Sequence, residues 1–233
     1  MSSEHVISEP AAIAHEVYGS QFSTLNRYID ILRSTGVEWG LLGPHEADRL
    51  WDRHILNSAA LSGLILAGRK VADVGSGAGL PGIPLALLRP DVRMTLIEPL
   101  LRRSNFLTQT VDELGLGERV EVIRSRAEDH SQTYDVVVAR ALAPLDRLIG
   151  WCNPLRSPDG MILALKGRSA ADEVSRAHRQ LDTARLKAEV LSVRAHPAAQ
   201  QATVVRLTPQ RIHERHGRIL DADNGSGRTC DIS

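Results

Sequence analysis

Cysteine is nearly absent from this chain of 233 residues, since only Cys152 and Cys230 occur and neither belongs to a CxxC pair. The chain therefore lacks the closely spaced ligands of a zinc site or a disulfide framework, and we expect no metal centre. Long hydrophobic runs are also missing, because the longest apolar patch, residues 60–67, is far shorter than the roughly 20 residues that span a bilayer. The first ten residues lack the basic start and apolar run of a signal peptide. These absences predict a cytoplasmic protein with no membrane partner.

Net charge of one sign is missing too, because 28 basic and 28 acidic side chains balance. The chain therefore has no global positive field that would attract a nucleic acid, although a local arginine-lined face stays possible. Lysine is scarce, since 25 of the 28 basic residues are arginine. A GC-rich genome explains this bias, and a surface built for bidentate contacts to phosphate or guanine is the alternative. The chain holds three Trp, three Tyr and two Phe, so extensive stacking on nucleobases is excluded.

Hydrophobic periodicity divides the chain into three parts. Apolar residues recur at spacings of three and four over 20–34, as on one face of a helix, and a second helix is expected to start at Pro44. Residues 1–67 are therefore predicted to form a helical N-terminal region. Residues 68–208 alternate short apolar runs with amphipathic segments, as in a doubly wound α/β domain. The polar residues 209–233 are expected to be a disordered tail.

Seven apolar runs of strand length are expected to form one sheet. The first five lie at 71–75, 94–98, 120–123, 134–139 and 161–166, with helical segments at 84–88, 101–114, 145–155 and 170–183. The last two runs, 189–195 and 202–208, are joined by only six residues, too few for a crossover helix. Parallel neighbours need such a crossover, so these two strands should pair antiparallel. The predicted fold is a mostly parallel, seven-stranded Rossmann-like sheet with an antiparallel last strand.

The strongest local pattern is VADVGSGAGLPG, residues 71–82, between the first expected strand and the next helix. Gly75, Gly77 and Gly79 allow a tight turn and a close approach of the backbone to a ligand, and the helix start offers free N–H groups. The dinucleotide fingerprint G-x-G-x-x-G would need glycine where Leu80 stands. A tight turn alone also uses glycine, but three at alternate positions favour a ligand-binding loop.

Acidic and small residues follow the next two expected strands at the same sheet edge. Glu98 stands 23 residues after Gly75, where a carboxylate accepts hydrogen bonds from ribose hydroxyls in doubly wound nucleoside sites. The alternative is an exposed acid at a strand end. Ala127 and Glu128 are expected to contact the adenine beside Glu98. Asp73 either holds an amino group through water or braces the glycine loop, and the sequence leaves both open.

Three features favour a methyltransferase over a nicotinamide enzyme. The glycine spacing is wrong for a dinucleotide, the final strand pair is expected to be antiparallel, and no Tyr is followed four residues later by Lys, as short-chain dehydrogenases require. The sequence therefore predicts a class I methyltransferase that uses S-adenosylmethionine as cofactor.

Five motifs resemble, in order, the bacterial small-subunit ribosomal RNA guanine-N7 methyltransferases, also called the glucose-inhibited division protein B family. They are LWDRHILNS (50–58), DVGSGAGLPGIPLA (73–86), SRAE (125–128), VVARALAPL (137–145) and LALKG (163–167). The resemblance spans about residues 20–208, and the arginine-rich style is similar to that of actinobacterial proteins. It implies methylation of N7 of one guanine in a loop of 16S rRNA near the decoding centre. The family's cofactor positions fall here on Gly75, Leu80, Ala127, Glu128 and Arg140.

Guanine N7 carries a lone pair and no proton, so no base is required, and we assign no catalytic residue. Arg140 and Lys166 are candidates for donating to guanine O6, although a strand-end lysine often only reaches solvent. Arg53 and His54 are candidates for contacts to RNA or to the rim of the site. Cys152 is the alternative nucleophile of a cytosine methyltransferase, but its position on a helix at core spacing favours an inert thiol.

Two other functions stay open on sequence alone. A small-molecule methyltransferase would use the helical N-terminal region as a lid over a closed pocket. A non-catalytic RNA-binding or protein-binding module would keep a degenerate cofactor loop. We favour the rRNA methyltransferase and expect a monomer whose partner is 16S rRNA within a small-subunit ribosomal particle, because the neutral chain should bind naked RNA weakly.

Overall fold

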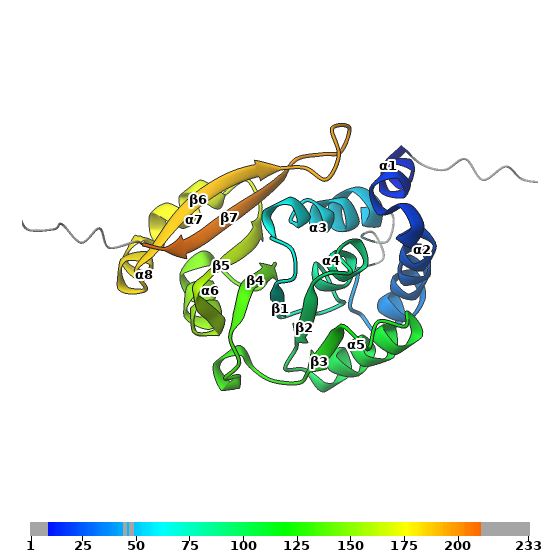
Figure 1. The fold of residues 1–233 in the computed structure, drawn as a ribbon, viewed down its shortest axis with the longest axis horizontal. Helices are drawn as coiled ribbons and strands as arrows, with labels where there is room; N and C mark the ends of the chain where they lie inside the picture. The colour runs from blue at the N-terminus through cyan, green and yellow to red at the C-terminus, as the bar shows by residue number, and fades with distance from the viewer. Residues whose placement is uncertain (1–8, 44–45, 47–48, 211–233) are drawn as a thin grey trace, which may run out of the picture.

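One seven-stranded sheet organises the chain, for which a computed structural model describes residues 9–43, 46 and 49–210. The strands are β1 (Lys70–Val74), β2 (Arg93–Ile97), β3 (Val120–Ile123), β4 (Tyr134–Arg140), β5 (Arg156–Lys166), β6 (Leu186–Val193) and β7 (Ala202–Pro209). Their order is β3-β2-β1-β4-β5-β7-β6. Strands β1 to β5 are parallel, whereas β7 is antiparallel to both β5 and β6 (Figure 1). The predicted sheet and its antiparallel last strand are confirmed.

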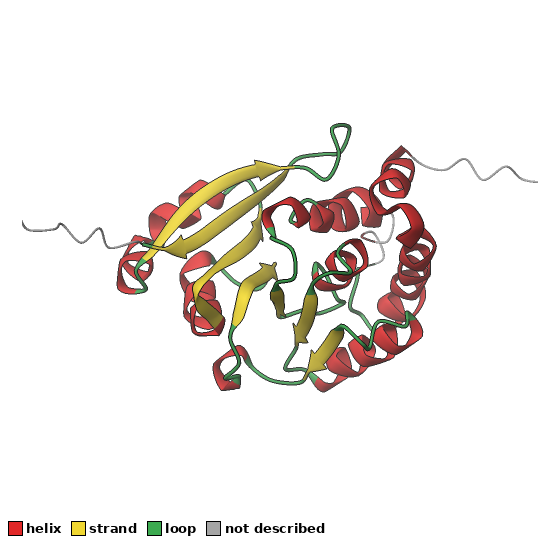
Figure 2. Cartoon of the chain, in the orientation of Figure 1, coloured by secondary structure: helices red, strands yellow, loops and turns green. Residues whose placement is uncertain are grey.

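Helices cover both faces of this sheet (Figure 2). They are α1 (Glu9–Tyr18), α2 (Phe22–Ile31), α3 (Asn57–Ala59), α4 (Gly82–Leu88), α5 (Leu101–Glu113), α6 (Leu145–Cys152), α7 (Ala170–Arg176) and α8 (His178–Thr183). Val136 and Val138 of β4 face one buried apolar cluster, and Val137 and Ala139 face another, as the alternation of a strand requires. Because both faces are buried, the central strands are continuously apolar, which made them visible in the sequence.

The N-terminal helices share one apolar cluster with α4, α5 and the first face of the sheet. The helix expected over 20–34 comprises α2 and a wider, π-type turn at Leu32–Gly36, and another such segment spans Leu50–Leu56 before α3. The helix start expected at Pro44 lies outside the described residues. Residues 211–233 of the expected tail lie outside them as well, while Pro209 ends β7. The parts of the chain that the structure describes contain no helix long and apolar enough to cross a membrane.

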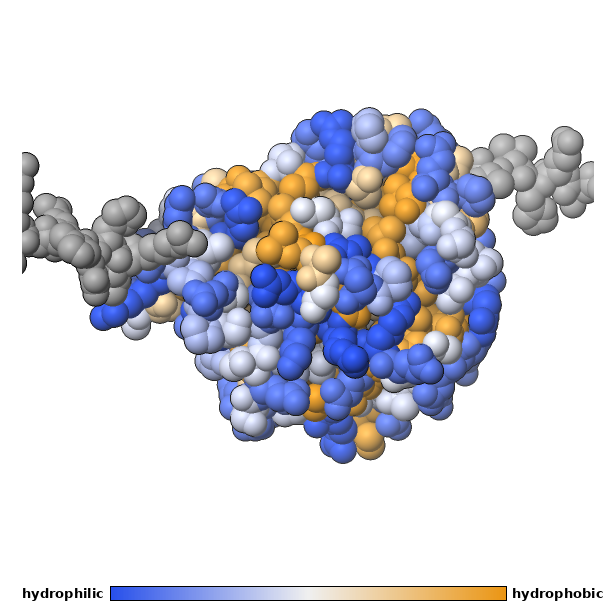
Figure 3. All heavy atoms as spheres, viewed as in Figure 1, coloured by the Kyte–Doolittle hydropathy of each residue, from blue (hydrophilic) through white to orange (hydrophobic). Residues whose placement is uncertain are grey.

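Two of the expected helices are shorter than the sequence predicted. The one expected over 145–155 ends as an α-helix at Cys152 and continues as a 3₁₀ turn, Asn153–Leu155, where Pro154 lacks a backbone N–H. The one expected over 170–183 is split at Ala177 into α7 and α8. On the face of the molecule seen in Figure 3, hydrophobic residues occur in small separate groups surrounded by hydrophilic ones.

Candidate functional site

The loop between β1 and α4 has a backbone that only glycine adopts easily. Gly75, Gly77 and Gly79 have φ angles of 70°, 58° and 95°, in the left-handed region. A Cβ atom at Gly75 would lie 2.4 Å from Cδ1 of Leu142, which packs against the loop. The absence of a side chain at Gly75 therefore lets the loop pack closely against Leu142.

Two buried carboxyl groups brace this loop. Gly82 donates its backbone N–H to Oδ2 of Asp73 at 2.9 Å, so the structure supports the bracing role for Asp73. Burial raises the pKa of Asp73 to about 7, against the hydrogen bond from Gly82, which lowers it. Glu98 is only 2% exposed, and its two carboxylate oxygens accept the N–H groups of Gly77 at 3.0 Å and Leu100 at 3.1 Å. Glu98 is thus no exposed strand-end acid.

A cavity of about 270 Å³ opens beside the loop at the carboxyl edge of β1 and β2. Its lining residues are Val74, Gly75, Ile97, Pro99, Leu100, Ser125, Arg126, Ala127, Glu128, Leu142 and Trp151. We call it the loop cavity. Three of the predicted cofactor residues, Gly75, Ala127 and Glu128, line it, while Gly77 and Glu98 lie bonded to each other next to it. Leu80 is not among the lining residues, because its side chain is buried in the apolar cluster of the N-terminal helices.

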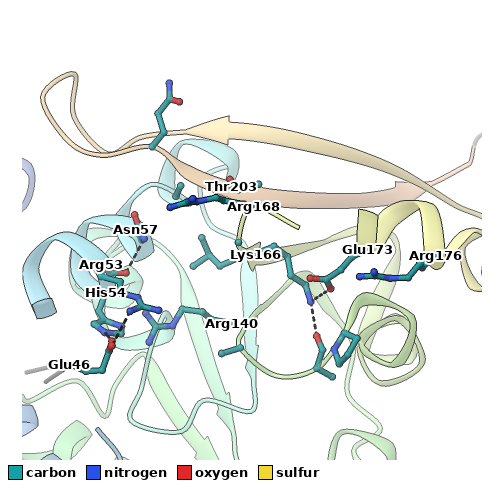
Figure 4. Close-up of a pocket in the computed structure, with 17 residues that line it drawn as sticks. Glu46, Arg53, His54, Asn57, Arg140, Lys166, Arg168, Glu173, Arg176 and Thr203 are labelled. Atoms are coloured by element: carbon teal, nitrogen blue, oxygen red, sulfur yellow. Dashed lines mark hydrogen bonds and ion pairs between the residues drawn. The ribbon is translucent and has the colours of Figure 1, made fainter. Parts of the chain in front are cut away.

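A larger cavity of about 890 Å³ lies at the carboxyl ends of β4 and β5 (Figure 4). Its lining residues are Glu46, Arg53, His54, Asn57, Arg140, Ala141, Ala143, Pro144, Leu165, Lys166, Gly167, Arg168, Glu173, Arg176, Gln201, Ala202 and Thr203. We call it the strand-end cavity. The three predicted substrate residues, Arg53, His54 and Lys166, meet here although they come from segments more than 100 residues apart. Arg140, a candidate both for the cofactor and for guanine O6, lines this cavity and not the loop cavity.

One short segment after β4 separates the two cavities. Leu142 lines the loop cavity, whereas Ala141 and Ala143 line the strand-end cavity. Ala141 has a φ of 50°, a left-handed conformation that is uncommon for a residue other than glycine. The cavities lie on either side of the point between β1 and β4 where the strand order reverses, which is where open α/β sheets bind ligands.

An ion pair and a hydrogen bond to Glu46 hold two side chains of the strand-end cavity in place. Glu46 binds Arg53 at 2.9 Å and Nε2 of His54 at 2.7 Å. Burial and the nearby Arg140 charge lower the pKa of His54, and Nδ1 of His54 has no hydrogen-bond partner among the described residues. Burial also lowers the pKa of Arg140, whose side chain forms no hydrogen bond with the described part of the chain. This guanidinium is therefore available to an anionic ligand.

Lys166 and Glu173 form a second pair in the same cavity, 2.8 Å apart. Burial by itself would raise the pKa of Glu173, but the hydrogen bond and charge of Lys166 hold this pKa below its usual range. Only 9% of the Lys166 side chain is exposed, so Lys166 does not simply reach into solvent.

Cys152 is fully buried in the apolar cluster under α6 and lines neither cavity. Burial raises the pKa of this thiol to about 12, so the thiol stays protonated and unreactive near neutral pH. Within 9–43, 46 and 49–210 there is also no group of three or more side chains suited to holding a metal ion. The site thus offers a glycine loop, paired charges and two adjoining cavities.

Sequence reasoning missed three residues of the site. Leu142 and Trp151 line the loop cavity, and Glu173 holds Lys166. The motif VVARALAPL contains Leu142, but its spacing does not show that Leu142 lines the loop cavity while Ala141 and Ala143 line the strand-end cavity. Glu173 has the sequence pattern of an ordinary acid in the first turn of a helix, and only the packing of α7 beside β5 reveals its partner.

Residues 21–204 match a family described as rRNA small subunit methyltransferase G. The chain belongs to this GidB family. The ribosomal RNA small subunit methyltransferase G of Mycolicibacterium gilvum is 48% identical to it over 221 residues, which are 91% of this chain and 96% of that protein. The protein of the same name from Mycobacterium avium is 53% identical over 182 residues, 76% of this chain and 73% of that protein. The resemblance drawn from the five motifs is confirmed.

More distant solved structures share the fold of this GidB family member. The pyocyanin biosynthetic protein PhzM is 15% identical, with a TM-score of 0.55 that covers 84% of this chain and 67% of that one. P. horikoshii TYW2, solved in complex with MeSAdo, is 12% identical, with a TM-score of 0.51 that covers 65% of this chain and 61% of that one. At these identities the similarity establishes the architecture alone.

Proposed function

We propose that this protein methylates N7 of a single guanine in 16S rRNA, with S-adenosylmethionine as the methyl donor. The observation that carries the proposal is the pair of adjoining cavities, which share the segment 141–143 as a common wall. Such an arrangement brings a cofactor on one side within reach of a base on the other. The membership in the GidB family supports the reaction and the rRNA substrate.

The residues of the loop cavity suit the adenosine part of S-adenosylmethionine by their polarity. Its apolar walls, among them Ala127 and Trp151, suit an adenine ring, and the Glu128 carboxylate can accept the exocyclic amino group. The carboxylate of Glu98 retains lone pairs for the ribose hydroxyls beyond its two backbone bonds. Glycine at position 75 lets Leu142, whose Cδ1 lies 2.4 Å from where a Cβ would stand, pack against the loop and line this cavity.

Arg140 is the proposed partner of the carboxylate in the methionine part of the cofactor. Arg140 directly precedes the segment 141–143 that separates the two cavities, and its guanidinium has no hydrogen-bond partner among the described residues. Gly77 and Leu80 contribute backbone only, since Leu80 points into the core.

The strand-end cavity fits a nucleotide, since its volume of about 890 Å³ exceeds what a single base needs. His54 Nδ1 and the third N–H of Lys166 are the proposed polar contacts to the guanine, and Arg53 contacts the RNA at the rim. When bound, the cofactor supplies a sulfonium methyl group, which the N7 lone pair takes while the electron pair of the broken C–S bond stays on sulfur. No base has to remove a proton, so the residues act by alignment and by excluding water.

The RNA partner is best presented by a small-subunit ribosomal particle, and the protein acts on it as a monomer. Arg168 and Arg176 line the strand-end cavity, and none of the ion pairs among the described residues involves them. They are suited to phosphates on either side of the target base. With zero net charge, such local contacts and the shape of the particle must provide the affinity.

The test is to incubate the protein with methyl-labelled S-adenosylmethionine and either small subunits from cells that lack this gene or a pool of small metabolites. Label is expected in 16S rRNA, and mass mapping should place one N7-methylguanine. Small subunits from cells that carry the gene are the control and should accept no label. Label that enters only small metabolites would refute the rRNA substrate, and failure to bind the cofactor in calorimetry would refute a methyltransferase.

A further inference from the structure

The ion pair between Lys166 and Glu173 forms hydrogen bonds to the backbone at the end of the segment 141–143, which is the wall between the two cavities. Lys166 Nζ donates to the backbone oxygen of Ala143 at 2.6 Å and to Oε2 of Glu173 at 2.8 Å. The same Oε2 accepts the backbone N–H of Leu145 at 3.0 Å. The pair thus binds the backbone on both sides of Pro144. Figure 4 shows Lys166 of β5 and Glu173 of α7 in contact.

These bonds lie at the end of the segment 141–143. Among the described residues, it is the only segment whose alternate residues line the two cavities. Leu142 lines the loop cavity, and the two alanines beside it line the strand-end cavity. The segment has no regular secondary structure between the end of β4 and the start of α6, and it contains the left-handed Ala141. Without side-chain anchors, backbone of this kind is free to shift.

The burial of the Lys166–Glu173 ion pair favours strong hydrogen bonds to the backbone that it holds. The Lys166 side chain is 9% exposed and that of Glu173 is 13% exposed, so water competes little for their bonds. Hydrogen bonds between ionised groups are shorter and stronger than neutral ones, and a protected pair loses little of this strength to solvent. Ser169 adds a weaker contact, with Oγ 3.3 Å from the other oxygen of Glu173.

We propose that Glu173, acting through Lys166 and the backbone of residues 143–145, is a positioning residue that fixes the distance between the methyl donor and the target base. This inference rests on the proposed function, because only a transfer across the wall depends on where the wall lies. Methyl transfer needs the reacting atoms in close alignment, and a displacement of about 1 Å can slow such a step roughly 100-fold. Glu173 itself contacts neither cofactor nor guanine in this assignment.

The experiment compares Glu173→Ala with Glu173→Gln in the full chain. Glutamine keeps an oxygen that accepts from Lys166 and Leu145, whereas alanine removes it. For Glu173→Ala we expect kcat to fall roughly 10- to 100-fold, with the Kd for S-adenosylmethionine and the KM for small subunits changed less than about threefold. Glu173→Gln should retain kcat within roughly fivefold of the wild type.

Amide hydrogen exchange supplies a readout that needs no substrate. The amide of Leu145 should exchange at least about tenfold faster in Glu173→Ala than in the wild type or Glu173→Gln, while the amide of Val138 in central β4 stays protected. If both amides accelerate together, the residue only stabilises the fold, and the proposal is overturned. It is also overturned if Leu145 alone accelerates and kcat is unchanged.

A matched control comes from the ion pair between Glu189 of β6 and Arg206 of β7, which touches neither cavity. Glu189→Ala should leave kcat and the Leu145 amide as in the wild type. Equal losses of kcat in Glu189→Ala and Glu173→Ala would refute the positioning role. If the wild type itself methylates no rRNA, the proposed function fails, while the exchange data still show whether Glu173 holds the wall.

Discussion

Asp73 should make the stability of this protein fall as the pH rises from about 4 to 7. Its carboxyl group is fully buried beneath the glycine loop, and Oδ1 has no hydrogen-bond partner among the described residues. Burial raises the pKa of Asp73 from 3.8 to about 7, so the folded protein keeps a proton that the unfolded chain has already released. In this window the folded state binds more protons, and stability therefore decreases with increasing pH.

The magnitude follows from the size of the pKa shift. Each pH unit between the two pKa values contributes about 1.4 kcal/mol, so the full penalty at alkaline pH is about 4 kcal/mol. Asp73→Asn removes the titration and keeps an oxygen for the N–H of Gly82, 2.9 Å away in the wild type. Relative to the wild type, the variant should gain about 2.5 kcal/mol in its free energy of unfolding between pH 5 and pH 8.

Urea unfolding of both proteins at pH 5, 6.5 and 8 measures this difference. Asp91→Asn is the control, because the hydrogen bond from Arg89 lowers the pKa of Asp91 below its ordinary value of 3.8 and this carboxyl group stays ionised in the folded and the unfolded chain throughout this pH range. The difference in stability between Asp91→Asn and the wild type should therefore be the same at pH 5, 6.5 and 8. A difference between Asp73→Asn and the wild type that is the same at pH 5 and pH 8 would refute the reasoning.

Three further predictions concern ligands. Glu98→Gln keeps one acceptor for the loop backbone but loses the charge, so calorimetry should show an S-adenosylmethionine affinity weaker by roughly tenfold, and an unchanged affinity would remove Glu98 from the ribose role. Gly75→Ala places a Cβ 2.4 Å from Leu142 at a backbone φ of 70°. We therefore expect the free energy of unfolding in urea to fall by about 1–3 kcal/mol and cofactor binding to be lost. Cofactor binding as tight as in the wild type would show that the loop tolerates a side chain. Arg176→Gln should reduce the slope of log affinity for RNA against log salt by about 0.7–0.9, whereas Arg93→Gln at the opposite edge of the sheet should not, and equal slopes in all proteins would exclude a phosphate contact by Arg176.

Local patterns were enough to predict the sheet and the loop. The central strands β1, β2 and β4 were visible because both of their faces are largely buried, which leaves a continuous apolar signal in the sequence. The edge strand β3 is partly exposed, and only its three Val and Ile residues carry the signal. The start of strand β5 was missed, since residues 156–160 contain no apolar run and Pro158 and Asp159 are exposed. The glycine loop was recognisable because glycine is the one residue type that adopts a left-handed backbone without steric strain.

The positions of charged side chains could not be predicted in the same way. Arg140 was a candidate both for the cofactor and for guanine O6, and only the structure shows that it lines the strand-end cavity together with His54. Glu98 was expected to accept hydrogen bonds from ribose hydroxyls, and the structure shows that its carboxylate also accepts the backbone N–H groups of Gly77 and Leu100. A carboxylate or guanidinium finds its partners across elements, so its role depends on packing that no local spacing encodes.

The sequence by itself determined the succession of strands and helices along the chain, the antiparallel pairing of the last two strands and the glycine loop. These features depend on periodicity, connection length and backbone conformation within short segments. Only the tertiary structure decided that two cavities share one wall and that Lys166 and Glu173 hold this wall. The carboxyl ends of parallel strands meet at one sheet edge, but the side chains that face one another there come from distant segments. Their distances are set by how the helices pack on the sheet, and this packing is a property of the whole chain.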